Sequence, residues 1–157
     1  MSTAEVYLYG HLLGVFFLLG AAGLSTGAGV ALARATSART VVTLTNMIRY
    51  SELIGTSLGT VLVIIFGFAL VSEKDYSMGD AWISAAFTLV IVVLAIDHGY
   101  LLRQNKKAHE MAEALGDRPV SEELRAHVNN PMTTAAGVVL DISFLVFLWL
   151  MIAKPGA

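Results

Sequence analysis

Four long, predominantly apolar runs are the feature that most constrains how this chain can fold. They extend over about residues 6–33, 51–71, 81–102 and 132–153. Each is close to the roughly 20 residues that a helix needs to cross a hydrocarbon core. Lipid offers no hydrogen bonds to an open backbone, so runs of this length form helices. We therefore predict an all-α, polytopic membrane protein: a four-transmembrane-helix bundle that forms a single domain over residues 1–157.

The amino-acid composition supports this class and excludes several others. Hydrophobic residues make up 56% of the chain and charged residues 14%, against about 45–50% and 25% in soluble domains. There is no cysteine and there are only three prolines, which excludes a disulfide scaffold and a collagen-like chain. A net charge of −2 without a basic patch argues against a nucleic-acid partner. The bilayer is the partner that the composition predicts.

The positive charges predict the orientation of the bundle. Eight of the ten lysines and arginines fall in the first and third connections between runs, and only Lys74 and Lys154 lie elsewhere. Loops rich in lysine and arginine stay in the cytoplasm. Both termini are therefore expected on the outer side of the membrane.

The third connection contains an amphipathic stretch. Ala108, Met111, Ala112 and Leu115 recur at helical spacing, with charged residues on the other faces. We expect this short cytoplasmic helix to lie along the membrane surface. Whether it is a solvated linker or a docking surface is left open by the sequence.

Glycines mark the faces on which membrane helices can pack closely. The first two runs carry them at four-residue spacing, with one more glycine further along the second: Gly10, Gly14, Gly23, Gly27, Gly55, Gly59 and Gly67. We expect the first two helices to pack backbone to backbone through these positions. A dimer contact through the same faces is the alternative.

Ionisable residues inside the spans are candidates for function, because their burial in lipid is costly. Glu52 follows Arg49 by three residues, so an ion pair at the inner interface is expected. Asp97 and His98 lie near the inner end of the third run, within reach of Arg49 or Arg103. A proton relay through these groups and Asp141 is a further hypothesis.

Asp141 lies deepest among the carboxyl groups. About nine residues separate it from Pro131, which places it roughly 13 Å into the core at 1.5 Å per residue. We expect it to be neutral and bonded to a hydroxyl, or to face a water-filled cavity. Hydroxyls that suit this role belong to Thr56, Thr60 and Ser143.

His11 is the only histidine in the outer half of the spans. Imidazole is a common ligand of haem iron, and a methionine such as Met151 can complete a His/Met pair. A hydrogen bond between helices is the alternative role for His11. The sequence contains no phosphate loop, HExxH or CxxC motif, so neither catalytic residues nor a protein-ligated metal site is predicted.

Several stretches together resemble a bacterial family of predicted four-span integral membrane proteins of unknown function. They are YLYGHLLGVFFLLGAAGL at 7–24, the pair Arg49 and Glu52, PVSEELRAHVNNP at 119–131 and FLWLMIAKPG at 147–156. This resemblance implies a four-helix fold in the bacterial inner membrane, and no particular activity.

The first run, with His11 followed by Gly20, is more distantly similar to that of copper-resistance D-type and protoporphyrinogen-oxidase-type membrane proteins. That resemblance implies b-type haem on His11, and electron transfer or tetrapyrrole oxidation.

Together, the residues and the resemblances lead to three functional hypotheses. The first is a small membrane protein without catalytic activity that self-associates or serves a larger membrane complex. The others are a b-haem protein and a proton-relay bundle.

Overall fold

The computed structural model describes residues 1–74 and 76–156, and every regular segment in this part is helical. In chain order the segments are α1 (Thr3–Arg34), α2 (Ala38–Tyr50), η1 (Ser51–Thr56), α3 (Ser57–Glu73), α4 (Ala81–Ile96), η2 (Asp97–Leu101), α5 (Leu102–Leu115), α6 (Glu122–Val128) and α7 (Pro131–Ala153). The π-helical turns η1 and η2 join their neighbours without a break. Residues 38–73 and 81–115 are therefore two continuous rods.

Four helices are long and apolar enough to cross a membrane: Thr3–Arg34, Ala38–Glu73, Ala81–Leu115 and Glu122–Ala153. The predicted all-α bundle with four spans is confirmed. The helices are longer than the apolar runs because α2 and α5 extend beyond the apolar segments with polar sequence.

Local sequence explains where the helices begin. Ser2 and Glu5 form a capping box at the start of α1, in which each side chain bonds to the backbone of the other residue. The side chain of Asn130 accepts from the Met132 amide, and Pro131 opens α7. Gly116 ends α5 with a φ of 64°, which glycine adopts without strain.

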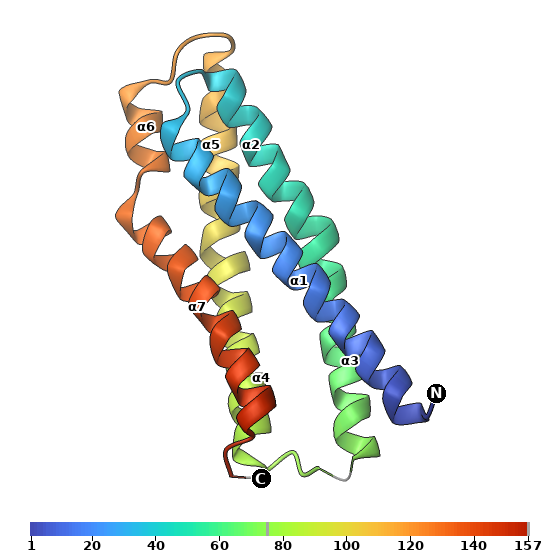
Figure 1. The fold of residues 1–157 in the computed structure, drawn as a ribbon. Helices are drawn as coiled ribbons and strands as arrows, with labels where there is room; N and C mark the ends of the chain where they lie inside the picture. The colour runs from blue at the N-terminus through green and yellow to red at the C-terminus, as the bar shows by residue number, and fades with distance from the viewer. Residues whose placement is uncertain (75, 157) are drawn as a thin grey trace.

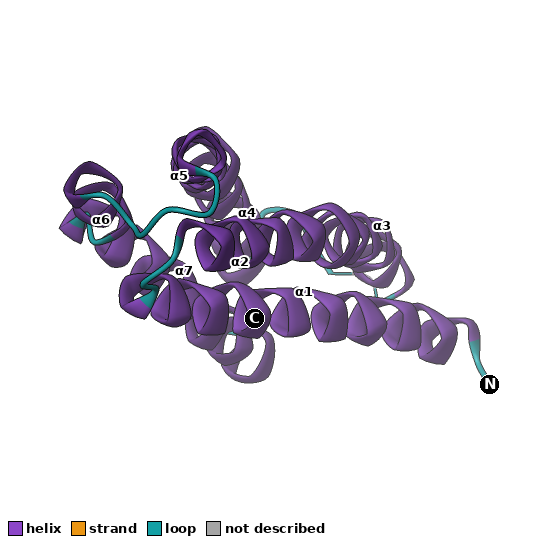
Figure 2. Cartoon of the chain, turned by 90° about the horizontal axis from the view of Figure 1, so that it is seen from above, coloured by secondary structure: helices purple, strands orange, loops and turns teal. Residues whose placement is uncertain are grey.

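Two pairs of helices make up the bundle: α1 packs on α3, and α4 packs on α7. The contact of α2 with α5 joins the two pairs. Figure 1 shows that the two pairs diverge toward the end where both chain termini lie. At the opposite end, α2, α5 and α6 lie close to one another (Figure 1). In the view from above, α3 lies away from α4 (Figure 2). The bundle is therefore closed at the end that carries the first and third connections and open at the other.

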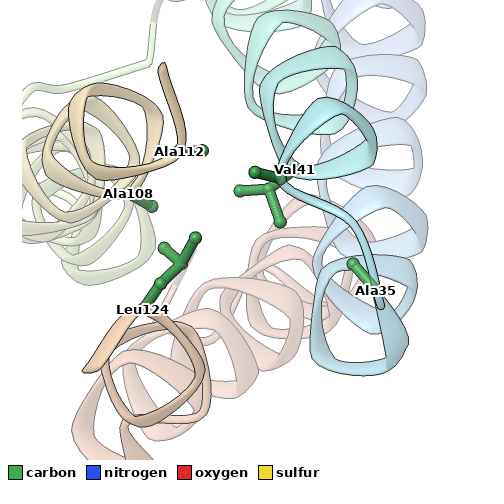
Figure 3. Close-up of a cluster of buried hydrophobic side chains, with 6 residues drawn as sticks. Ala35, Val41, Ala108, Ala112 and Leu124 are labelled. Atoms are coloured by element: carbon green, nitrogen blue, oxygen red, sulfur yellow. The ribbon is translucent and has the colours of Figure 1, made fainter. Parts of the chain in front are cut away.

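The closed end forms a small apolar cap. Buried side chains of α2, α5 and α6 meet there with the linker before α2: Ala35, Ala38, Val41, Ala108, Ala112 and Leu124. Figure 3 shows Val41 and Leu124 pointing toward each other beside the two α5 alanines. The expectation that 108–115 lies along the membrane surface is wrong, because α5 continues the line of α4 and buries its apolar face against α2 and α6.

Truncation of Leu124 tests how far the cap stabilises the fold. The side chain is fully buried, and Leu→Ala at such a site typically costs about 3 kcal/mol because a cavity remains. We expect Leu124→Ala to lower the free energy of unfolding in detergent by about that amount. Leu58→Ala, at an exposed position on α3, is the matched control, and equal losses for both variants would show that the cap is not a stabilising core.

Glycines bring α1 and α3 into backbone contact. A Cβ on Gly14 would lie 2.8 Å from the Val63 nitrogen and 2.9 Å from the Gly59 oxygen. A Cβ on Gly55 would lie 2.7 Å from the Cβ of Ala21. The helices therefore meet at a distance that only glycine permits at these positions.

Two of the predicted packing glycines have no such neighbour. Gly23 and Gly27 face open space, with no atom within 4 Å of an added Cβ. The remaining two pack against side chains: Gly10 lies against the ring of Phe66 and Gly67 against the ring of His11. The stretch of α1 around residues 23–27 thus presents a smooth outer face.

Candidate functional site

The open end of the bundle leads into a cleft of about 1310 Å³ between the α1/α3 and α4/α7 pairs. Its walls are mainly aliphatic and aromatic, and it extends from Ser2 and Lys154 at the termini to His127 beside the cap. Large apolar pockets with a few polar groups are typical ligand sites. His11, Glu52, Asp97 and Asp141 all line this cleft, so four of the ionisable residues singled out in the sequence share one space.

His11 is held on α1 by a contact with α3. Its Nδ1 lies 3.1 Å from the carbonyl oxygen of Val63. A carbonyl only accepts hydrogen bonds, so Nδ1 carries the proton and Nε2 keeps its lone pair in the neutral ring. A Cβ on Gly67 would lie 3.4 Å from Cε1 and from Nδ1 of the ring. Nε2 has no partner in the described part of the chain and is accessible in the cleft.

Met151 lies on the opposite wall of the same cleft. It belongs to α7, which packs on α4, whereas His11 belongs to the α1/α3 wall. The two helices diverge toward the end of the bundle where both chain termini lie (Figure 1). The His/Met pair remains a prediction, in which a ligand would have to bridge the two walls.

Glu52 and Asp97 come from different helices and meet at the end of the cleft nearer the cap. Their carboxyl groups are neighbours, and one oxygen of each, Glu52 Oε2 and Asp97 Oδ2, is buried without a hydrogen-bond partner among the described residues. Asp97 is only 7% exposed. Ser25 on α1 donates to Glu52 Oε1 at 3.2 Å and is 2.8 Å from the Ser51 hydroxyl. The expected Arg49–Glu52 pair is wrong: none of the ion pairs between described residues joins them.

Both carboxyl groups lie on π-helical turns. Glu52 belongs to η1 and Asp97 begins η2. Single π turns inside α-helices are frequent at functional sites. Both helices therefore leave regular α geometry at the position of the carboxyl pair.

His98 lies at the edge of this pair. Its Nδ1 is 3.2 Å from Asp97 Oδ2, but outside hydrogen-bond geometry. Half of its side chain is exposed, and it does not line the cleft. Of the four predicted relay residues, His98 is therefore the most peripheral.

Asp141 is bound by a hydroxyl, as its depth predicted, but the partner is Thr26 of α1. The Thr26 hydroxyl lies 3.2 Å from both carboxyl oxygens of Asp141. Of the hydroxyls proposed from the sequence, Ser143 donates to Val139 O and Thr56 lies beside Glu52. The bond joins α1 to α7 across the cleft.

Sequence reasoning missed Ser25 and Thr26, although they link α1 to both carboxyl sites. A signal was present, because they are the only serine and threonine in the 28 residues of the first apolar run, 6–33. Adjacent residues of a helix point about 100° apart. Ser25 can therefore face Glu52 while Thr26 faces Asp141.

Comparison with known proteins identifies the family. The model of the predicted integral membrane proteins (DUF2269) matches residues 6–155, and its description names no catalytic activity. No curated protein and no solved structure matches the chain. The resemblance to four-span membrane proteins of unknown function is confirmed, and the chain belongs to this family of predicted integral membrane proteins, DUF2269.

Proposed function

We propose that the cleft binds b-type haem with His11 as an axial ligand. The observation that carries this proposal is the state of the imidazole: Nδ1 is bonded to the Val63 carbonyl and Nε2 is left accessible in the cleft. Ligating histidines commonly donate their other ring proton to a carbonyl, which fixes the ring orientation. The ring is therefore preorganised for ligation before any ligand enters.

The surroundings of His11 suit a large, flat, apolar group. Leu12 and Val15 of α1 line the cleft beside it, and Phe144 and Leu148 of α7 line the facing wall. The cleft volume of about 1310 Å³ exceeds the 300–1,000 Å³ typical of small-molecule pockets. Bound haem would supply one-electron chemistry, which fits electron transfer or tetrapyrrole oxidation. His11 would hold the iron, and the apolar walls would exclude water from it.

An absorption spectrum of the detergent-purified protein tests this proposal. Expressed with adequate haem, the wild type is expected to show a Soret band and a sharp α-band after dithionite reduction. His11→Ala removes the ligand and is expected to lose both bands, whereas His127→Ala, whose ring bonds to the Gln104 carbonyl, keeps them. If the folded wild type is colourless, the haem proposal fails.

A proton-transfer function is the second candidate, supported by the continuity of the polar groups. From the end nearer the cap, Asp97 faces Glu52, Ser25 bonds to Glu52, and the next residue of α1, Thr26, bonds to Asp141. Two neighbouring carboxyl groups can share one proton and pass it on. We propose Asp141 as the next acceptor on this path.

Self-association or service in a larger membrane complex is the third candidate. It is supported by the outer face of α1, where Gly23 and Gly27 have no neighbour within 4 Å. Glycines at this spacing allow a second helix to approach closely in lipid. We propose this face, rather than the Gly14–Gly59 contact already used inside the bundle, as the place for a partner helix.

For localisation we propose the bacterial inner membrane with both termini outside. Support comes from the charge distribution, because eight of ten lysines and arginines lie in the first and third connections. The cap is built from these two connections, so in this orientation it lies on the cytoplasmic side. The open end of the cleft then faces outward.

A further inference from the structure

Three polar side chains gather at the open end of the cleft. Lys154 follows the last turn of α7, Tyr76 follows α3, and Trp82 lies in the first turn of α4. The Lys154 ammonium lies 2.8 Å from the Tyr76 hydroxyl, 4.9 Å from the centre of the Tyr76 ring and 5.6 Å from that of Trp82. The two rings meet edge to face at 5.4 Å. We call these three residues the outer cluster.

The outer cluster has more donors than acceptors. Lys154 uses one of its three protons on the Tyr76 oxygen, so the hydroxyl proton of Tyr76 is free to donate. Trp82 is only 5% exposed, and its indole N–H has no partner among the described residues. A buried donor without a partner costs free energy that a bound acceptor would recover. An anionic oxygen group is the complement of such a set.

Two of the nearby carboxylates, those of Glu5 and Asp80, accept hydrogen bonds from backbone nitrogens. Glu5, on the α1 side of the opening, accepts from the Ser2 backbone nitrogen at 2.7 Å. Asp80 accepts from the Ser77 nitrogen at 3.2 Å. Within residues 1–74 and 76–156, none of the ion pairs involves Lys154. Lys74 adds a second positive charge to the same end of the cleft.

The cleft joins this charged end to long apolar walls. Lys154, Tyr76 and Trp82 line it together with Phe87 and Phe147, which pack beside Trp82. An occupant that suits both parts has an anionic head at the level of the membrane interface and an apolar body within the bilayer. Basic pockets between membrane helices bind lipid headgroups in this way.

We propose that the outer cluster binds the phosphate of a phospholipid headgroup, with the acyl chains lying in the cleft. The Lys154 ammonium, the Tyr76 hydroxyl and the Trp82 indole N–H donate to the phosphate oxygens. The two aromatic rings hold the ammonium in place through cation–π contact. The phosphate contacts do not involve His11, but the acyl chains lie in the cleft that we propose for haem, so lipid binding is measured on haem-free protein.

Native mass spectrometry of the detergent-purified protein, titrated with phosphatidylglycerol, tests the proposal. We expect one bound lipid per chain. Lys154→Met removes a charged donor and should weaken binding about tenfold or more. Trp82→Phe keeps the ring and removes only the N–H, and should weaken binding severalfold. Trp149→Phe, at a half-exposed position near the end of α7, is the matched control and should bind as the wild type does.

Two further ligands identify what is recognised. Diacylglycerol has the chains without the phosphate and should bind far more weakly, whereas equal binding would overturn the headgroup site. Inorganic phosphate has no chains and should not displace the lipid; full displacement would assign the site to a free anion instead. The proposal also fails if Lys154→Met and Trp82→Phe both bind as the wild type does. Compared without bound haem, His11→Ala should bind lipid as the wild type does, which separates this result from the haem test.

Discussion

Replacing Gly14 by leucine is expected to abolish recovery of folded monomer in detergent. An added Cβ already lies 2.8 Å from the Val63 nitrogen and from the Cβ of Leu62, and 2.9 Å from the Gly59 oxygen. The nitrogen and the carbonyl oxygen are backbone atoms, which cannot move aside as a flexible side chain does. Relief therefore requires α1 and α3 to separate. Overpacking in a core costs about 1–3 kcal/mol, and a leucine between two backbones should exceed that range.

Gly23→Leu is the matched control for this experiment. It places the same side chain on the same helix at a position with no atom within 4 Å of the new Cβ. We expect Gly23→Leu to be recovered folded and to unfold at nearly the same temperature as the wild type by circular dichroism, because the new side chain meets nothing inside the bundle. Equal behaviour of the two variants would show that α1 and α3 do not meet through Gly14.

Asp141→Asn is expected to reduce proton flux into vesicles to the background of protein-free vesicles. The amide keeps the size of the side chain and can still accept from Thr26, so the link between α1 and α7 survives. It cannot, however, take up and release a proton. Positioned acid–base groups typically contribute 10²–10⁴-fold to proton transfer, so the loss should be at least about a hundredfold. A pH-sensitive dye inside vesicles held at a fixed potential measures the flux.

Two further variants help to interpret the Asp141→Asn result. Ser143→Ala removes a hydroxyl on the same helix that bonds only to its own backbone at Val139, and it should leave the flux unchanged. Thr26→Val removes the hydroxyl that holds Asp141, and an intermediate flux is expected. If wild-type protein carries no more protons than empty vesicles, the relay is refuted and Asp141 serves to tie α1 to α7.

The polar sites show which contacts could be predicted from the sequence and which could not. Depth along a span follows from counting residues, and the need of Asp141 for a hydroxyl was correctly predicted on that basis. The identity of the hydroxyl was not, because Thr26 lies 115 positions away in the chain. The same limit applies to Glu52: its neighbour Arg49 is evident in the sequence, whereas the contact with Asp97 depends on how two separate rods are turned toward each other.

The cap shows a second limit of prediction from the sequence. The sequence correctly marks one face of 108–115 as apolar, because amphipathic spacing is a local property. An apolar stripe is satisfied equally by lipid or by protein, however. Only the path of α5, continuous with α4, brings that face against Val41 and Leu124 instead of the membrane surface.

The sequence by itself determined the class of the protein and its four spans. Both follow from the length of the apolar runs, because in lipid a helix is the form that satisfies the backbone of such a run. The tertiary structure alone decided which faces meet. The spans are apolar all round, so no stripe indicates how each is rotated about its axis. The Gly14–Gly59 contact, the Thr26–Asp141 bond, the Val63 carbonyl on His11 and the cleft itself all depend on that rotation.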